Sequence, residues 1–143
     1  GFAKAKLPVV ATFHSLLMNE IPAMFPKLRW AFVEVSAQWV PYVLNDLSIR
    51  LSRRGVEMSN SIMADNNMYV ACQVTDDLDY VVKYAGETQL MVGTDYGHAD
   101  TSTEIEAMRK LSSDGKVSPE IAAKILEDNK INFIGSTIII VIL

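Results

Sequence analysis

Three short apolar runs, separated by segments with helical spacing, constrain the fold of this chain more than any other feature. The runs span residues 28–35, 68–74 and 89–93. Each is short, apolar and bounded by turn or loop residues, which is typical of strands. Because helix-length segments separate the runs, they predict parallel strands joined by right-handed helical crossovers. The sequence therefore predicts an α/β fold built on a parallel sheet.

Helical spacing fills the segments around these runs. Apolar residues three and four positions apart, with capping or stop signals at the ends, predict five helices. These helices span residues 8–25, 37–53, 77–85, 101–111 and 118–128. The polar segment 57–67 predicts a loop or a short helix. Three strands are few for a parallel sheet that stands alone, because such a sheet needs cover on both faces.

Composition excludes several classes of partner. The 143 residues are 50% hydrophobic and 21% charged, with a net charge of −4, which is the balance of one globular domain. The largest basic cluster is Arg53-Arg54, so the sequence predicts no nucleic-acid partner. The apolar tail 138–143 is too short to cross a bilayer, which takes about 20 residues. The single cysteine, Cys72, forms no internal disulfide and fits a cytoplasmic, reducing compartment.

Four segments together resemble one family. They read FPKLRWAFVEVSAQWVPYVL (residues 25–44), NMYVAC (67–72), GETQLMVGTDYGHAD (86–100) and KILEDN (124–129). Their order and spacing resemble the amidohydrolase superfamily, in particular the amidohydrolase-related, aminocarboxymuconate decarboxylase-like branch. The resemblance implies a (β/α)8 TIM barrel, of which residues 1–135 supply strands six, seven and eight with their flanking helices. Residues 136–143 form an atypical apolar tail, which is a candidate strand at a sheet edge.

The resemblance also implies an activity and a set of site residues. Members of this family are metal-dependent hydrolases that cleave a C–N, C–O or C–C bond of a small carboxylate or cyclic substrate through metal-activated water. The family's divalent metal is expected to be zinc or manganese. Asp95, directly after the third run, matches a metal ligand that also accepts a proton from the attacking water. Glu34, at the end of the first run, matches a general acid or base where the family often has histidine, and His98 and Trp39 match substrate-binding positions.

Each of these residues also has a structural interpretation. Asp95 could cap a turn, Glu34 could form an ion pair at the barrel rim, and His98 could be a loop histidine. Trp39 could belong to the core or to an interface. His14 lies within a helical pattern and is interpreted as structural, and Cys72 as a buried, inert thiol.

Two other functions remain open. One is the non-oxidative decarboxylase of the same family, and the other is a catalytically incomplete fragment that folds through oligomerisation. Asp95 is a single good ligand, whereas such a metal site needs three or more. The resemblance implies a small-molecule substrate. The shortage of ligands predicts a homo-oligomer or a missing amino-terminal half that completes the site. A flavodoxin-like binding domain is a weaker third interpretation, because the chain has no Gly-rich phosphate loop.

Overall fold

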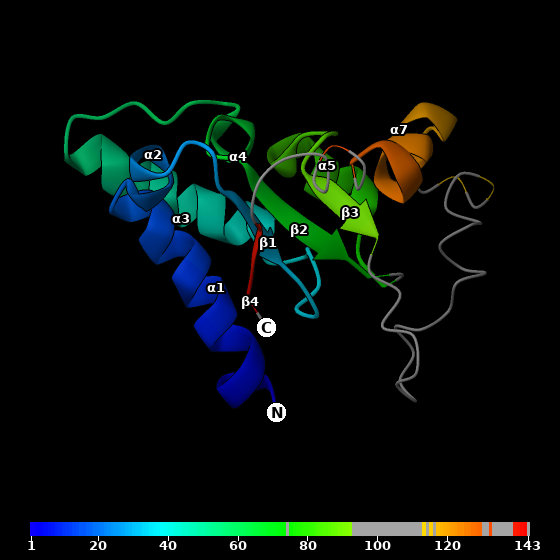
Figure 1. Cartoon of the computed structure of the whole chain (residues 1–143), viewed down its shortest axis with the longest axis horizontal. Helices are drawn as coiled ribbons and strands as arrows, with labels where there is room; N and C mark the ends of the chain where they lie inside the picture. The colour runs from blue at the N-terminus through cyan, green and yellow to red at the C-terminus, as the bar shows by residue number, and fades with distance from the viewer. Residues whose placement is uncertain are drawn as a thin grey trace.

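A parallel sheet lies at the centre of the structure, a computed structural model that describes residues 1–73, 75–92, 113, 115, 117–129, 132 and 139–142. Within these residues the sheet has four strands in the order β3-β2-β1-β4 (Figure 1). The strands are β1 (Arg29–Phe32), β2 (Met68–Cys72), β3 (Leu90–Val92) and β4 (Ile139–Ile142). All three neighbouring pairs are parallel. The sheet confirms the predicted α/β fold and places the apolar tail at a sheet edge.

The described helices connect or flank these strands. They are α1 (Phe2–Met18), α2 (Ile21–Met24), α3 (Val40–Arg53), α4 (Ile62–Asp65), α5 (Leu78–Ala85) and α7 (Pro119–Ala123), which continues as the π-helix η2 (Lys124–Asp128). The predicted α5 begins and ends as expected: the Asp77 side chain accepts from the N–H of Tyr80 at 3.2 Å, and Gly86 ends the helix with φ +83°. Gly86 suits that backbone because glycine has no Cβ to clash. The helix predicted over 101–111 lies outside the described residues.

The first helix differs from its prediction at both ends. It begins at Phe2 and contains Pro8, which the sequence had indicated as its start. The prediction applied the preference of proline for the first helical turn, but six residues before Pro8 are also helical. The predicted single helix 8–25 is in fact divided, because Glu20 adopts a left-handed backbone with φ 55° between α1 and α2. None of the described helices is both long enough and apolar enough to cross a membrane.

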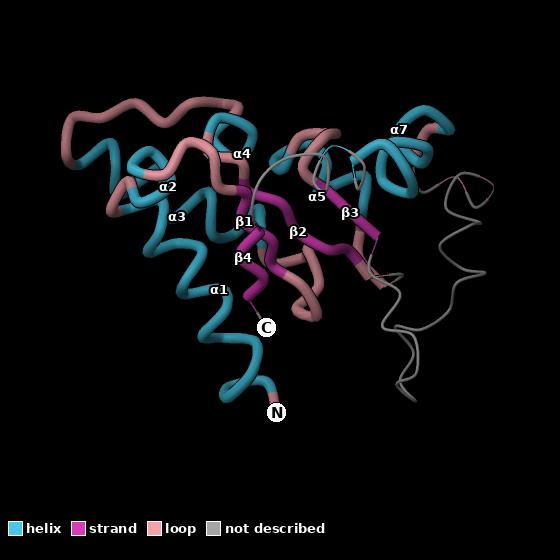
Figure 2. The backbone as a smooth tube through the Cα atoms, viewed as in Figure 1, coloured by secondary structure: helices cyan, strands magenta, loops and turns pink. Residues whose placement is uncertain are grey.

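The two faces of the sheet bury different sets of side chains. One face packs against α1, α3 and α5, whose arrangement around the strands is drawn in Figure 2. It forms the main core, in which Phe13, Phe32, Leu47 and Leu78 are nearly inaccessible. The opposite face presents a small second cluster made of Ala31, Tyr69 and Met91, one from each of β1, β2 and β3. The alternation follows from strand geometry, since successive side chains point to opposite faces. Both faces of the strands are therefore buried, as in a parallel sheet with two covered sides.

Cys72 lies in the main core, as the sequence predicted. Its thiol donates to the Met91 carbonyl oxygen at 3.2 Å, and burial raises the pKa of Cys72 from 9.0 to about 12. The unfolded thiol ionises near pH 9, whereas the folded thiol stays protonated up to about pH 12. The contribution of the buried thiol to the free energy of unfolding is therefore fully present below pH 9. It is lost as the pH rises from 9 towards 12, because the unfolded thiol ionises there and the folded thiol does not.

We expect native Cys72 to be almost unreactive towards a chromogenic disulfide reagent at pH 8. The Cys72 thiolate would have to attack a sulfur atom of the reagent and release its coloured thiolate, and burial keeps Cys72 protonated and out of reach of the reagent. In denaturing urea the same thiol should react completely within minutes, and absorbance of the released thiolate measures both rates. Equal rates in buffer and in urea would contradict the burial of this side chain.

Candidate functional site

The carboxyl ends of β1, β2 and β3 meet at one edge of the sheet, because the three strands are parallel (Figure 1). Ligand sites of parallel α/β folds lie at this edge. The loop 33–39 follows β1 there, and the segment 73–77 follows β2. We call these two segments the rim. The predicted site residues Glu34 and Trp39 both lie in the first of them.

A buried carboxylate fastens the two halves of the rim. Asp76 is only 4% exposed. Its Oδ2 accepts from the backbone N–H of Ala37 at 2.9 Å and of Gln73 at 2.8 Å, and its Oδ1 accepts from the Ser36 hydroxyl. Buried carboxylates are tolerated when their oxygens are satisfied in this way. Asp76 therefore ties the loop after β1 to the segment after β2.

A second hydrogen bond joins the same two segments of the rim. The backbone N–H of Asp77 donates to the Gln38 side-chain oxygen at 2.7 Å. Asp77 then caps α5, so the rim and the start of α5 form one hydrogen-bonded unit. Thr75, Asp76 and Asp77 precede α5 and are all residue types that cap helices. Asp77 fills that role, whereas Asp76 serves the rim, and its partners some 40 positions earlier are not visible in a local pattern.

Glu34 lies two residues beyond the end of β1. Its backbone has φ 62°, and Ser36 has φ 65°, a conformation that non-glycine residues adopt rarely. Two such residues in three positions bend the chain sharply at the rim. The Glu34 side chain is exposed to solvent, so the buried environment expected for a tuned acid or base is not the one observed. Its catalytic role therefore stays a prediction.

Trp39 is half-buried at the start of α3. Its ring packs edge-on against Phe13 at 5.0 Å between centroids and against Phe32 at 6.4 Å. Its indole N–H donates to the Ser36 carbonyl oxygen at 2.7 Å. These contacts are those of a core residue that also supports the rim, which was one of the two interpretations of the sequence. Substrate contact by Trp39 stays a prediction.

The other two predicted site residues, Asp95 and His98, lie outside the described residues. Strand β3 ends at Val92, three positions before Asp95. Because β3 is parallel to β2, its carboxyl end lies at the same edge as the rim.

The described part of the chain does not assemble ligands for the zinc or manganese that the family resemblance implies. Among the described residues, no group of three or more His, Cys, Asp or Glu side chains is close enough to hold a metal ion. Both oxygens of Asp76 are already used by protein donors. The described donor set thus does not fit such an ion.

His14 has the structural position that the sequence indicated. It lies on α1, and its Nε2 is 3.1 Å from Asp46 Oδ2 on α3 without the alignment of a hydrogen bond. Asp46 also accepts from Arg50 at 2.6 Å, and chiefly this contact holds the pKa of Asp46 below its usual value. His14 therefore contributes to the packing of α1 against α3.

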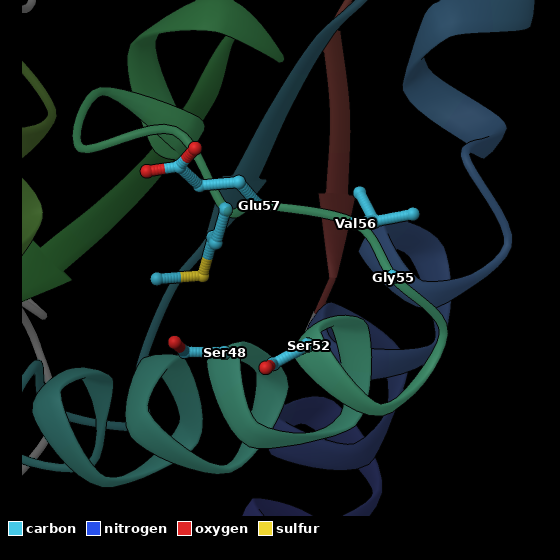
Figure 3. Close-up of a pocket in the computed structure, with 6 residues that line it drawn as sticks. Ser48, Ser52, Gly55, Val56 and Glu57 are labelled. Carbon is cyan, nitrogen blue, oxygen red and sulfur yellow. The ribbon is translucent and has the colours of Figure 1, made fainter.

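A surface hollow lies away from the rim. Ser48 and Ser52 of α3 face a loop that carries Gly55 and Glu57 across an open depression of about 450 Å³ (Figure 3). Helix α3 starts after the carboxyl end of β1 and runs back towards the amino end of β2. This hollow therefore lies near the amino ends of the strands. Ligand sites of parallel α/β folds lie at the opposite end of the strands.

Comparison with known proteins adds a likeness of fold. No family model matches the sequence, and no curated protein matches it. One solved structure that matches is an amidohydrolase from Mycobacterium avium subsp. paratuberculosis K-10, with a TM-score of 0.70 and 19% sequence identity. The match covers 85% of this chain but 32% of that chain, so this chain spans about a third of the amidohydrolase. The described residues thus share the fold of part of an amidohydrolase.

Proposed function

We propose that this chain is the strand-six to strand-eight portion of a (β/α)8 barrel whose complete form is an amidohydrolase-related, metal-dependent hydrolase. The observation that carries the proposal is the likeness of fold to part of an amidohydrolase, at a TM-score of 0.70. The parallel sheet, whose rim segments are joined by hydrogen bonds at the carboxyl ends of β1 and β2, agrees with that likeness. The substrate class that fits is a small carboxylate or cyclic compound with a hydrolysable C–N, C–O or C–C bond.

The two faces of the sheet support a barrel. In a (β/α)8 barrel, helices cover the outer face of each strand and the inner face is a packed interior. Here α1, α3 and α5 cover one face, and Ala31, Tyr69 and Met91 form a separate buried layer on the other. The strands β1, β2 and β3 also follow one another around the sheet in chain order, as consecutive barrel strands do. This order supports their assignment as strands six, seven and eight.

The chemistry that this chain brings to the rim is proton transfer and alignment. Glu34 is the titratable side chain of the loop 33–39, and an exposed carboxylate at the carboxyl end of a barrel strand can accept or donate a proton. Asp76 holds the backbone of this loop against the segment after β2 and thereby sets the position of Glu34. Asp95 is the proposed metal ligand of this portion, and its partner ligands belong to the remainder of the barrel.

The test joins this chain to the amino-terminal barrel portion of the Mycobacterium avium amidohydrolase. We expect the isolated chain to bind zinc or manganese weakly and to show no measurable hydrolysis. The joined protein should bind about one metal ion per molecule and hydrolyse members of a panel of cyclic amides and small carboxylates. Asp95→Asn should then remove the metal and the activity. Glu34→Gln should lower kcat with metal content unchanged, because the amide cannot exchange a proton.

Glu57→Gln is the matched control for Glu34→Gln. Both side chains are exposed glutamates, but Glu57 lies beside the hollow at the amino ends of the strands. Elemental analysis and turnover are measured for every variant, and release of carbon dioxide identifies the decarboxylase alternative. A full complement of metal in the isolated chain that survives Asp95→Asn would overturn the proposed site.

A further inference from the structure

The tail strand β4 pairs with β1 on the side opposite β2. It pairs in parallel with β1 from Arg29 opposite Ile139 to Phe32 opposite Ile142 (Figure 2). Among the described strands, β4 has one hydrogen-bonded neighbour, since it is the last strand in the order β3-β2-β1-β4. The edge of the first strand is thus covered by a segment more than 100 positions later in the chain.

The position of β4 beside β1 departs from the order in which the other strands follow one another across the sheet. The strands β1, β2 and β3 advance across the sheet in one direction, and a fourth strand that continued the series would lie beyond β3. Strand β4 instead lies beside β1, on the opposite edge. In a closed barrel with continuous winding, that place belongs to the strand that precedes β1, because closure pairs every edge.

The chain that leads to β4 is fastened separately from β4 itself. The Asn129 side chain, 1% exposed, donates to the carbonyl oxygens of Glu87 at 2.8 Å and Leu90 at 2.7 Å, which holds η2 at the amino end of β3. The Arg29 guanidinium then donates to the carbonyl oxygen of Asn132 beside the amino end of β1. These contacts hold residues 129 and 132 through partners in β1, in β3 and just before β3, and none of them involves a residue of β4.

We propose that the edge of β1 is an acceptor site for a parallel strand, and that β4 is its displaceable occupant within the chain. The incoming occupant is the strand that precedes β1 in the complete barrel, so this partner assignment rests on the proposed function. The site recognises a short extended segment through backbone hydrogen bonds, and alternating apolar side chains set the register. Because β4 contributes four paired residues, a longer strand with its own flanking helix competes favourably.

The first experiment measures strand binding directly. The probe is a fluorescent peptide with the sequence of residues 136–143, STIIIVIL, followed by three lysines for solubility. The double variant Ile140→Pro/Val141→Pro frees the edge of β1, because alternate N–H groups of a strand face one neighbour and one of the two prolines must remove such a group. We expect the variant to bind the peptide at least tenfold more tightly than the wild-type chain, as measured by fluorescence anisotropy.

A peptide with proline at the positions of Ile140 and Val141 is the matched control and should bind neither chain. A folded variant, by circular dichroism, that binds the unmodified peptide no better than wild type overturns the proposal. If the variant does not fold, hydrogen exchange of the wild-type chain tests whether the peptide displaces β4. With saturating peptide, amides 139–142 should lose protection while amides 68–72 keep it, and unchanged protection of 139–142 overturns the proposal.

Two further measurements decide which partner uses the site. The amino-terminal barrel portion of the Mycobacterium avium amidohydrolase should bind the proline variant more tightly than the wild-type chain, and equal binding counts against this partner. A stable wild-type dimer in light scattering that the double proline substitution converts to monomer would make a second copy the occupant and overturn the partner assignment. Peptide binding involves no turnover, so an acceptor site with no hydrolase activity in the joined protein would sink the proposed function alone.

Discussion

Replacing Asp76 by alanine should lower the free energy of unfolding by about 3–5 kcal/mol. The carboxylate is nearly inaccessible and accepts from the N–H groups of Ala37 and Gln73 and from the Ser36 hydroxyl. Alanine leaves the buried N–H of Ala37 without an acceptor, together with the half-buried donors of Gln73 and Ser36. Each buried unsatisfied donor costs about 1–3 kcal/mol. The loss is measured from urea unfolding curves followed by circular dichroism.

The series around Asp76 separates its charge from its shape. Asp76→Asn keeps the shape and one acceptor oxygen, so it should cost less than Asp76→Ala, about 1–3 kcal/mol. Asp79→Ala is the matched control, because Asp79 is an exposed carboxylate nearby on α5 whose partner is Lys83 at 2.8 Å. An exposed pair of this kind contributes about 0.2–1 kcal/mol. Equal unfolding midpoints for Asp76→Ala and Asp79→Ala would refute the role of Asp76 in fastening the rim.

The strands were predictable because their signal is local and strong. The runs at 28–35, 68–74 and 89–93 each contain the observed strand, with ends that differ by a few residues. Burial on both faces makes strands such as β2 and β3 continuously apolar, which distinguishes them from amphipathic helices. The break at Glu20 was not predictable, because a left-handed turn at glutamate has no sequence signal comparable to that of Gly86.

The partner of the tail could not be predicted in the same way. Its β-branched composition indicates a strand, but the choice of β1 as its neighbour depends on which edge is free in three dimensions. The same limit applies to Asp76. Its pattern before α5 is that of a helix cap, and only contacts with residues 36 and 37 reveal its role at the rim. Long-range hydrogen bonds leave no periodic pattern in a single sequence.

The site was predictable to the level of an edge of the sheet. A parallel sheet brings the carboxyl ends of its strands together, so the sequence predicts that Glu34 and Asp95 face the same side of the sheet. Glu34 lies just beyond the carboxyl end of β1, and Asp95 lies outside the described residues. The sequence did not predict that Trp39 would direct its indole N–H to Ser36 and its ring to the core. Aromatic residues at strand ends have equal sequence signals whether they line a pocket or pack beneath one.

A second large loss of stability is expected from a substitution at Phe32, where the rim meets the core. Phe32, the last residue of β1, is fully buried and packs edge-on against Phe13 of α1 at 5.1 Å between centroids, with Trp39 at 6.4 Å. Phe32→Ala should lower the free energy of unfolding by about 3–5 kcal/mol, through lost burial and the cavity that remains. Urea unfolding provides the measurement, and Phe2→Ala, at a residue that is 67% exposed, is the control with little expected change.

A double-mutant cycle between Phe32 and Phe13 isolates the contact between their rings. Edge-to-face pairs contribute about 0.5–1.5 kcal/mol beyond the area that they bury, so the loss in the double variant should fall short of the sum of the single losses by about that amount. Because Trp39 touches both rings and donates to Ser36, Phe32→Ala should also loosen the rim. Hydrogen exchange at residues 36–38 should therefore be faster in Phe32→Ala than in wild type under native conditions. Additive losses together with unchanged exchange would mean that the core and the rim are energetically independent.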